Sequence, residues 1–579
     1  MDRTELNHGW SLPPAVIAGA FALALCPLLV DHLLFHPDER HYVDAALEIL
    51  STGDWLTPRT AAGDLRLQKP VLAYWFAALG AYVWGPSPFS VRWLFLLSGA
   101  ATVWCGARAA RIISGSAIAA TVVACLLACH PALLAASTRS LPDIVMALFL
   151  TGSMAGFLTI LTQRRADWAP LLAAYLGGAL AVLAKGAPAV AFVMYGTAYI
   201  VWTERTLLRA QWHRFVTAAG LAALVSISWF LVMTDRHGGE LGRQFLVDQG
   251  AAHRFAAHPV QILLQSLEST LLLGVSFVVF LLPAIRPLCS RRRIILTYVK
   301  RPAFLFLTGW IGLFVICTAF INHVNLRYLL PAVVPLAIVL GCLIVELDSP
   351  LLRRNLRMSA GLTLGVLLLT GLASCWLSLG SGLLVPLLAV ATALILQRLR
   401  LQLRYTSITR SVTVACAALL TAILVLSASY RLHVGPSFGY QMATALRQRT
   451  PAGSPVVLQL IGHAAHASKV RICSGGDVHV QHVPPSELAL VRPFHGAVAA
   501  LDPSDLPSDS IRKPMLSIAC GFEGVDVGEV WKAWRAGTLP DYLAVHQRTY
   551  TLLIPDADRP DAVESPTSTA GAEHSSVVR

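Results

Sequence analysis

Residues 35–69 read FHPDERHYVDAALEILSTGDWLTPRTAAGDLRLQK, a polar stretch between a first apolar segment and a chain that is mostly apolar from Pro70 onward. Two adjacent carboxylates, Asp38 and Glu39, stand where the chain leaves the first apolar segment. Ionisable side chains beside a membrane span are costly and are seldom kept for packing alone. The stretch therefore predicts a reaction site at the surface of a bilayer.

The composition is that of a membrane protein. Of the 579 residues, 55% are hydrophobic and 13% are charged, and the mean hydropathy is +0.62. The net charge of +13 comes from Arg clusters in short loops between apolar runs. Such clusters serve the positive-inside rule and anionic headgroups. We therefore expect membrane lipids, and no nucleic acid, as partners.

Apolar runs of about 20 residues can cross a bilayer, and the sequence predicts thirteen spans in an all-α polytopic body. The spans are 13–34, 91–113, 116–136, 142–162, 168–184, 188–203, 213–234, 262–285, 303–321, 328–346, 357–379, 382–396 and 411–430. A further apolar segment, Pro70–Gly85, is short and rich in Tyr and Trp, which favour the headgroup level. We predict that it forms a re-entrant or juxtamembrane helix.

With that segment not crossing, the Arg-rich loops all fall on one side of the membrane, which the positive-inside rule makes cytoplasmic. The N-terminus is then cytoplasmic, and the 35–69 stretch and everything after Tyr430 lie on the non-cytoplasmic face.

The expected domains differ in composition. They are a transmembrane catalytic domain, 1–430, with its first non-cytoplasmic loop at 35–90; a small α/β soluble domain, 431–556; and a disordered tail, 557–579. In the soluble domain, strand-like runs are expected at 455–461, 477–483, 488–491 and 550–554, and Cys473 and Cys520 could pair in an oxidising compartment.

Three carboxylates are candidates for chemistry. Asp38, next to Glu39, could act as a general base for an acceptor hydroxyl or amine. Asp143 lies in the first turn of an apolar helix on the same predicted face. An Asp in that place could instead cap the helix.

Isolated cations on the predicted non-cytoplasmic face are contrary to the positive-inside rule. A bound phosphate is one reason for such cations, although any one of them alone could be a snorkelling residue at the end of a span. The set is Lys69, Lys185, Arg254 and Arg327 with its neighbour Tyr328. Tyr74 and Trp75 could stack on a sugar or only anchor their helix at the headgroup level.

The order of these motifs resembles one family. The motifs are Asp38-Glu39 with Tyr42, Gly53-Asp54-Trp55, Lys69-Pro70 with Tyr74-Trp75, Asp143, Lys185-Gly186 and Arg327-Tyr328-Leu329-Leu330-Pro331. Over about residues 10–345 the chain is similar to the bacterial relatives of the protein O-mannosyltransferases, which include the lipid A 4-amino-4-deoxy-L-arabinose transferases.

This resemblance implies a GT-C fold in a bacterial inner (plasma) membrane, with the non-cytoplasmic face periplasmic. It also implies an inverting transfer of a sugar from polyprenyl (undecaprenyl) phosphate to a lipid A-type or other envelope glycan. It implies catalytic roles for Asp38, Glu39 and Asp143, and binding of the donor phosphate by Lys69, Lys185, Arg254, Arg327 and Tyr328. It also implies that His41, Tyr42, Gln68, Tyr74 and Trp75 line the sugar and acceptor site.

The sequence departs from the family at three places. His41 stands where Arg is usual, Gln68 where Glu is usual, and Gln249 where some arabinose transferases have a metal-binding His; His253 and His258 are close by. Since a lost acidic ligand weakens metal binding, we predict no obligatory metal or other cofactor and a sugar other than aminoarabinose.

Three other functions stay open at this point. They are a protein O-mannosyl-type transfer to Ser or Thr, transport of lipid-linked sugars, and a non-catalytic envelope protein with a degenerate site. Transporters commonly hold their charged residues near the bilayer midplane within repeated halves. Here the charges lie at the ends of spans and no repeat is apparent, which favours an enzyme. The sequence names neither the sugar, nor the acceptor, nor the oligomeric state.

Overall fold

A computed structural model describes most of the chain. The described residues are 11–30, 37–247, 259–320, 325–377, 391–401 without 393 and 400, 407–434, 438–448, 456–484, 486, 497–506, 512–522, 547–555 and single positions between 529 and 542. The chain divides into two compact units, Met1–Gly435 and Pro436–Arg579. Each unit is described by itself.

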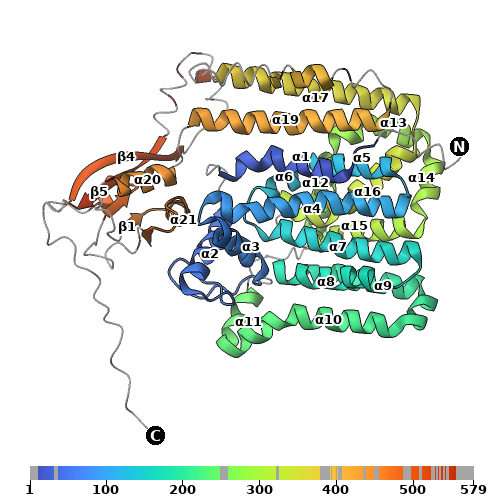
Figure 1. Cartoon of the computed structure of the whole chain (residues 1–579), viewed down its shortest axis with the longest axis horizontal. Helices are drawn as coiled ribbons and strands as arrows, with labels where there is room; N and C mark the ends of the chain where they lie inside the picture. The colour runs from blue at the N-terminus through green and yellow to red at the C-terminus, as the bar shows by residue number, and fades with distance from the viewer. Residues whose placement is uncertain are drawn as a thin grey trace, which may run out of the picture. The chain divides into compact units, whose positions relative to one another are not determined.

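The first unit is a bundle of helices (Figure 1). Its α-helices are α1 (Pro14–Leu25), α2 (Arg40–Thr52), α3 (Leu72–Trp84), α4 (Pro88–Ser114), α5 (Ala117–Ala128), α6 (Pro131–Ser137), α7 (Pro142–Gln163), α8 (Trp168–Lys185), α9 (Pro188–Thr203), α10 (Arg205–His237), α11 (Gly239–Leu246), α12 (Pro259–Val275), α13 (Val278–Ser290), α14 (Arg292–Val299), α15 (Pro302–Ala319), α16 (Leu330–Glu346), α17 (Pro350–Leu377) and α19 (Ile408–Val434). Short 3-10 turns are η2 (Cys26–Val30), η3 (Pro37–Glu39) and η5 (Leu326–Leu329).

The predicted polytopic membrane body is confirmed. Among the described residues, eight helices are long and apolar enough to cross a membrane, and two bent pairs, α5 with α6 and α12 with α13, raise the number to ten. These ten account for ten of the thirteen predicted spans. Of the other three, 13–34 and 188–203 form shorter helices, and 382–396 lies largely outside the described residues.

Local signals in the sequence set where the helices begin and end. Ser87 and Ser90 form a reciprocal capping box at the start of α4, with Pro88 at its first position. The first-loop helix α2 stops at Gly53, which takes the left-handed conformation (φ 72°) that glycine tolerates best.

The predicted juxtamembrane segment forms α3, a helix of 13 residues. At 1.5 Å per residue it is about 20 Å long, shorter than the hydrocarbon core of a bilayer. It packs on α2 and α4. A Cβ atom on Gly80 would lie 1.9 Å from the backbone oxygen of Ser90, so only glycine allows this approach of α3 to α4.

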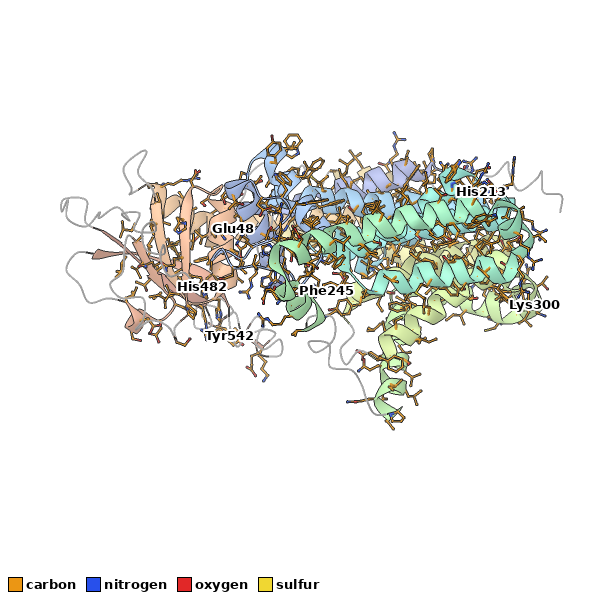
Figure 2. The ribbon with its side chains drawn as sticks, turned by 90° about the horizontal axis from the view of Figure 1, so that it is seen from below. Glu48, His213, Phe245, Lys300, His482 and Tyr542 are labelled. Atoms are coloured by element: carbon orange, nitrogen blue, oxygen red, sulfur yellow. The ribbon has the colours of Figure 1, made fainter. Side chains whose placement is uncertain are left out.

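Two ends of the first unit differ in what they hold. Figure 2 shows Glu48 of α2 and Phe245 of α11 at one end, and His213 of α10 and Lys300, which follows α14, at the opposite end. The first-loop helix therefore lies at the end away from the Arg-rich loop that leads to Lys300.

The second unit is a mixed five-stranded sheet with the order β2-β1-β3-β5-β4. Strands β1 (Val456–Ile461), β2 (Val478–Val483) and β3 (Ala497–Ala500) are parallel, whereas β5 (Gln547–Pro555) runs antiparallel to β3 and to β4 (Arg512–Phe522). Helices α20 (Phe438–Arg447) and α21 (Ala464–Cys473) complete its core, and a 3-10 turn, η7 (Pro503–Asp505), follows β3.

The predicted small α/β domain is present, with corrections. The strand-like runs at 455–461, 477–483 and 550–554 match β1, β2 and part of β5, whereas β3 and β4 were not anticipated. The run 488–491 and the tail 557–579 lie outside the described residues. Cys473 and Cys520 are not joined by a disulfide bond.

Candidate active site

Asp38 lies on the 3-10 turn η3, immediately before α2, and its side chain is 50% exposed. Its Oδ2 atom accepts a hydrogen bond of 2.6 Å from Nη2 of Arg327. Arg327 comes from η5, the turn that begins α16, and its side chain is only 15% exposed. The first polar loop and the start of a distant span therefore meet at this ion pair.

Asp143 belongs to the same cluster. It lies in the first turn of α7 and is buried. Its Oδ1 atom accepts a hydrogen bond of 2.5 Å from Nζ of Lys185 at the end of α8, and its Oδ2 lies 3.9 Å from Nε of Arg327. Asp143 thus pairs with two cations, and Arg327 lies between it and Asp38.

Tyr328 packs against both cations. Nζ of Lys185 lies 4.3 Å from the centre of the Tyr328 ring, and Cζ of Arg327 lies 5.4 Å from it. An aromatic face at such distances attracts a cation. The ring therefore helps to hold Lys185 and Arg327 in place, while the prediction that Tyr328 contacts a phosphate stays a prediction.

Glu39 lies beside Asp38 in the sequence but in a different environment. Its carboxylate is fully buried and accepts two hydrogen bonds from Arg92 of α4, at 2.6 and 2.8 Å. The backbone N–H of Ser140 donates a third, at 2.8 Å. These partners favour a positioning role for Glu39, and its predicted catalytic role stays a prediction.

His41 opens α2 close to Asp38. Burial, together with the positive charges of Arg66 and Arg40, lowers the pKa of His41 from 6.5 to about 3, while Asp38 opposes the shift. The imidazole is therefore neutral at physiological pH. It can accept or donate a hydrogen bond at the site, but it is not a substitute for the arginine that the resemblance places there.

The predicted aromatic residues pack against one another and against the first loop. The rings of Tyr42 and Tyr74 stack with their centres 4.9 Å apart, and both residues are buried. Nε1 of Trp75 donates a hydrogen bond of 2.5 Å to the backbone oxygen of Trp55. These contacts fix α3 against the first loop, and sugar stacking by Tyr74 or Trp75 stays a prediction.

Gln68 and Lys69 follow a small hairpin, in which Arg59 and Leu65 pair, and both are half-buried. Gln244 of α11 holds this loop from the other side. Its Oε1 accepts the backbone N–H of Leu67 at 2.8 Å, and its Nε2 donates to the backbone oxygen of Leu65 at 3.3 Å. Gln244 thus positions the segment that carries Lys69.

Arg254 lies outside the described residues, as do Gln249, His253 and His258, so their predicted roles stay predictions. Within the described part of the chain there is no group of three or more His, Cys, Asp or Glu side chains that could hold a metal ion.

The structure adds two residues that sequence patterns did not single out. Arg92 lies inside an apolar helix, where an ionisable residue is a functional signal by default, and it neutralises Glu39. Gln244 gives no comparable signal, because a glutamine on a polar helix after a long span is common.

Comparisons with known proteins agree with the resemblance. The family model described as dolichyl-phosphate-mannose-protein mannosyltransferase matches residues 17–236, less than half of the chain. A curated relative from Yersinia enterocolitica (serotype O:8 / biotype 1B, strain NCTC 13174 / 8081), an undecaprenyl phosphate-alpha-4-amino-4-deoxy-L-arabinose arabinosyl transferase, is 26% identical over 360 residues. The match covers 60% of this chain and 62% of that relative.

Two crystal structures of ArnT from Cupriavidus metallidurans have a similar fold. The one bound to undecaprenyl phosphate has a TM-score of 0.62 at 19% identity, and the apo one has 0.63 at 18%. Each comparison covers 93% of this chain and 97% of the other. The predicted GT-C fold and the resemblance to this glycosyltransferase superfamily are confirmed.

Proposed function

We propose that this chain is an inverting glycosyltransferase that moves a sugar from a polyprenyl (undecaprenyl) phosphate to a lipid A-type or other envelope glycan acceptor. The observation that carries the proposal is the group formed by Asp38, Arg327, Asp143 and Lys185. It joins a half-exposed carboxylate to two cations whose side chains are each only 15% exposed. The fold of ArnT, one of whose structures is bound to undecaprenyl phosphate, supports this choice of sugar donor.

In the proposed reaction, an acceptor hydroxyl or amine attacks C1 of the sugar from the side opposite the phosphate. Its proton passes to the carboxylate of Asp38, the glycosidic C–O bond breaks, and the bonding electron pair stays on the phosphate oxygen. The configuration at C1 is inverted. Asp38 suits the role of base because its side chain is 50% exposed and so is open to an incoming group, unlike buried Asp143.

The departing phosphate gains negative charge as the bond breaks, and fixed cations lower the energy of that state. Lys185 and Arg327 are the described cations best placed for this task, since Tyr328 and Asp143 hold both of them. Lys69 and Arg254 complete the proposed phosphate-binding set. Asp143 in turn orients the two cations and can contact a sugar or acceptor hydroxyl.

No obligatory metal enters this proposal. Gln68 is half-buried and offers an amide where the resemblance leads one to expect a carboxylate, a weaker ligand for a divalent ion. The check is sugar transfer after treatment with EDTA. Unchanged turnover supports the proposal, and loss of turnover that Mg²⁺, Mn²⁺ or Zn²⁺ restores contradicts it.

We also propose that the N-terminus is cytoplasmic and that the site and the second unit face the periplasm. The positive-inside rule supports this orientation, because Glu48 of α2 lies at the end opposite Lys300 and its Arg-rich loop (Figure 2). Labelling of single cysteines by an impermeant maleimide in intact cells is the test. A label at position 64, in the first loop, and none at position 300 is expected.

A protein acceptor is the second candidate, because the matching family model is that of protein mannosyltransferases. The deciding experiment offers radiolabelled undecaprenyl-phosphate sugars to the purified protein with either lipid A or Ser/Thr-containing peptides. Label in the lipid fraction supports the glycan acceptor, and label in the peptide replaces it with a protein acceptor. No transfer from any donor, with intact folded protein, contradicts both.

A further inference from the structure

Most charged groups of the candidate site form ion pairs with one another. Asp38 pairs with Arg327, Asp143 with Lys185, and Glu39 with Arg92. The loop 138–141, between α6 and α7, brings one more cation, Arg139. Its neighbour Ser140 donates its backbone N–H to Glu39, so the loop is fixed beside the first-loop carboxylates.

Arg139 is half-buried and has no anionic partner of its own among the described residues. Its Nε atom is buried and makes no hydrogen bond, and none of the described carboxylates lies within 4 Å of its guanidinium. Burial lowers the pKa of Arg139, as do the charges of Arg92 and Arg327, against the raising effect of Glu39. Arg139 therefore lies close enough to both arginines for their charges to repel it.

This arrangement is unfavourable in the protein alone. A guanidinium taken partly out of water needs an anion or hydrogen-bond acceptors to offset its lost hydration. The positive charges of two neighbouring arginines add electrostatic repulsion. Nε of Arg327 is likewise buried without a hydrogen-bond partner. Arg139 and Arg327, whose charges repel each other, thus each have one buried N–H that makes no hydrogen bond.

We propose that Arg139 is a further phosphate-binding residue of this site and, together with the Nε–H of Arg327, which makes no hydrogen bond, receives the phosphate of the lipid-linked sugar donor. The inference rests on the proposed function and adds a phosphate-binding residue that is not part of the sequence motifs. An arginine suits this place because its planar N–H groups bind phosphate oxygens at fixed angles. The anion also relieves the repulsion among Arg139, Arg327 and Arg92.

The test is binding of undecaprenyl phosphate to the purified full-length protein in nanodiscs. Arg139→Gln is expected to weaken binding by about tenfold to a hundredfold, the loss typical of one or two charge-assisted hydrogen bonds. Arg139→Lys is expected to recover part of it, because the charge returns without the planar geometry. The affinity of Arg139→Gln should also depend less on salt than that of the wild type, whereas Arg139→Lys, which keeps the charge, should retain the salt dependence.

Arg357→Gln is the matched control. Arg357 lies in α17 and also has a buried Nε without a hydrogen-bond partner, but it is remote in sequence from every residue of the site. Its variant should bind undecaprenyl phosphate like the wild type. If Arg357→Gln weakens binding as much as Arg139→Gln, the loss reflects general destabilisation and the inference fails. A thermal unfolding curve for each variant shows whether the protein is folded.

The outcome separates this inference from the proposed function. Wild-type transfer with unchanged binding of undecaprenyl phosphate to Arg139→Gln overturns the inference and leaves the function standing. A raised KM for the acceptor with unchanged binding of undecaprenyl phosphate assigns Arg139 to the acceptor instead and also overturns it. A wild-type protein that neither transfers sugar nor binds undecaprenyl phosphate contradicts the proposed function itself.

Discussion

Arg327 and Asp38 form a hydrogen-bonded ion pair of 2.6 Å although 289 positions separate them in the sequence. The pair links the first polar loop to the start of α16. Because Nε of the same arginine lies 3.9 Å from Asp143, one side chain relates both candidate carboxylates. A change at any of the three residues should therefore affect the other two.

Asp38→Asn should abolish sugar transfer while leaving the phosphate site intact. A general base contributes about a hundredfold to ten-thousandfold to a rate, so turnover should fall by at least about a hundredfold. Affinity for undecaprenyl phosphate should stay the same or rise, because Arg327 loses a competing anion. Radiolabel transfer and lipid binding measure the two effects. Asp64→Asn, an exposed carboxylate in the same loop, is the control and should behave as the wild type.

Glu39→Gln should mainly lower the free energy of unfolding of the first unit and should have a smaller effect on the binding of undecaprenyl phosphate. The substitution leaves Arg92, which is 1% exposed, without its anion, and breaking a buried ion pair costs about 3–5 kcal/mol. Replacing both residues, as Glu39→Leu with Arg92→Met, should recover part of that loss. Denaturation in detergent measures it.

The exposed pair Glu240 and Arg243 is the comparison for that experiment. Glu240→Gln should change the midpoint of unfolding very little, since surface ion pairs contribute little. Equal losses for Glu39→Gln and Glu240→Gln would show that the buried pair does not stabilise the fold in the way described.

Tyr328→Phe and Tyr328→Leu separate two roles of this side chain. Phe keeps the ring against Lys185 but removes the hydroxyl, and a lost hydrogen bond to a phosphate should weaken lipid binding about tenfold. Leu removes the ring as well and should weaken lipid binding further. Exposed Tyr82 provides the control, Tyr82→Phe. Wild-type binding by Tyr328→Phe would exclude the hydroxyl as a phosphate ligand and leave only the packing role.

His41 should make the protein sensitive to acid. Its pKa in the folded protein, about 3, is below its ordinary value of 6.5, so the unfolded chain binds more protons between these values. The free energy of unfolding should therefore fall as the pH decreases from about 6.5 toward 3. His41→Gln should lose less stability than the wild type between about pH 7 and 5, as unfolding temperatures at each pH would show.

The control for this prediction is His213→Gln, at an exposed position, which should follow the wild-type curve. Since His41 stays neutral over the physiological range, the pH dependence of turnover between about pH 6 and 8 should be the same in His41→Gln. A shifted turnover profile would assign His41 a direct part in proton transfer.

Gln244→Leu should weaken the attachment of the first loop to α11. It removes both hydrogen bonds to the backbone at Leu65 and Leu67, two residues before Lys69. We expect a higher KM for the lipid-linked donor, with a smaller change in kcat. Gln244→Glu keeps the acceptor for the N–H of Leu67, so its KM for the donor should lie between those of the wild type and Gln244→Leu. Unchanged kinetics for Gln244→Leu would show that Lys69 is placed by other contacts.

The sequence predicted the parts of this molecule that depend on local patterns. Apolar length identified the spans, and charge against the positive-inside rule selected Lys185 and Arg327, which the structure brings together around Asp143. Sequence spacing could not distinguish Asp38 from Glu39. Their different environments come from the partners that other helices supply, Arg327 to one and Arg92 to the other.

Long-range contacts explain what the sequence missed. Nothing near Gln244 or Arg139 in the chain indicates that each lies against the first-loop segment or its ion pairs. In the second unit, β3 is a run of small residues, Ala497–Ala500, that carries little strand signal on its own. It becomes a central strand because β1 and β5 pair with it on both sides.

Mass spectrometry of lipid A, other envelope glycolipids and periplasmic proteins tests the central claim most directly. The samples are cells that contain the protein, cells that lack it, and cells that contain only Asp38→Asn. We predict that one sugar-sized mass disappears from an envelope glycolipid both in the deletion and in Asp38→Asn. No change in any acceptor mass, with undecaprenyl-phosphate sugar accumulating on one leaflet, would contradict glycosyl transfer and indicate transport.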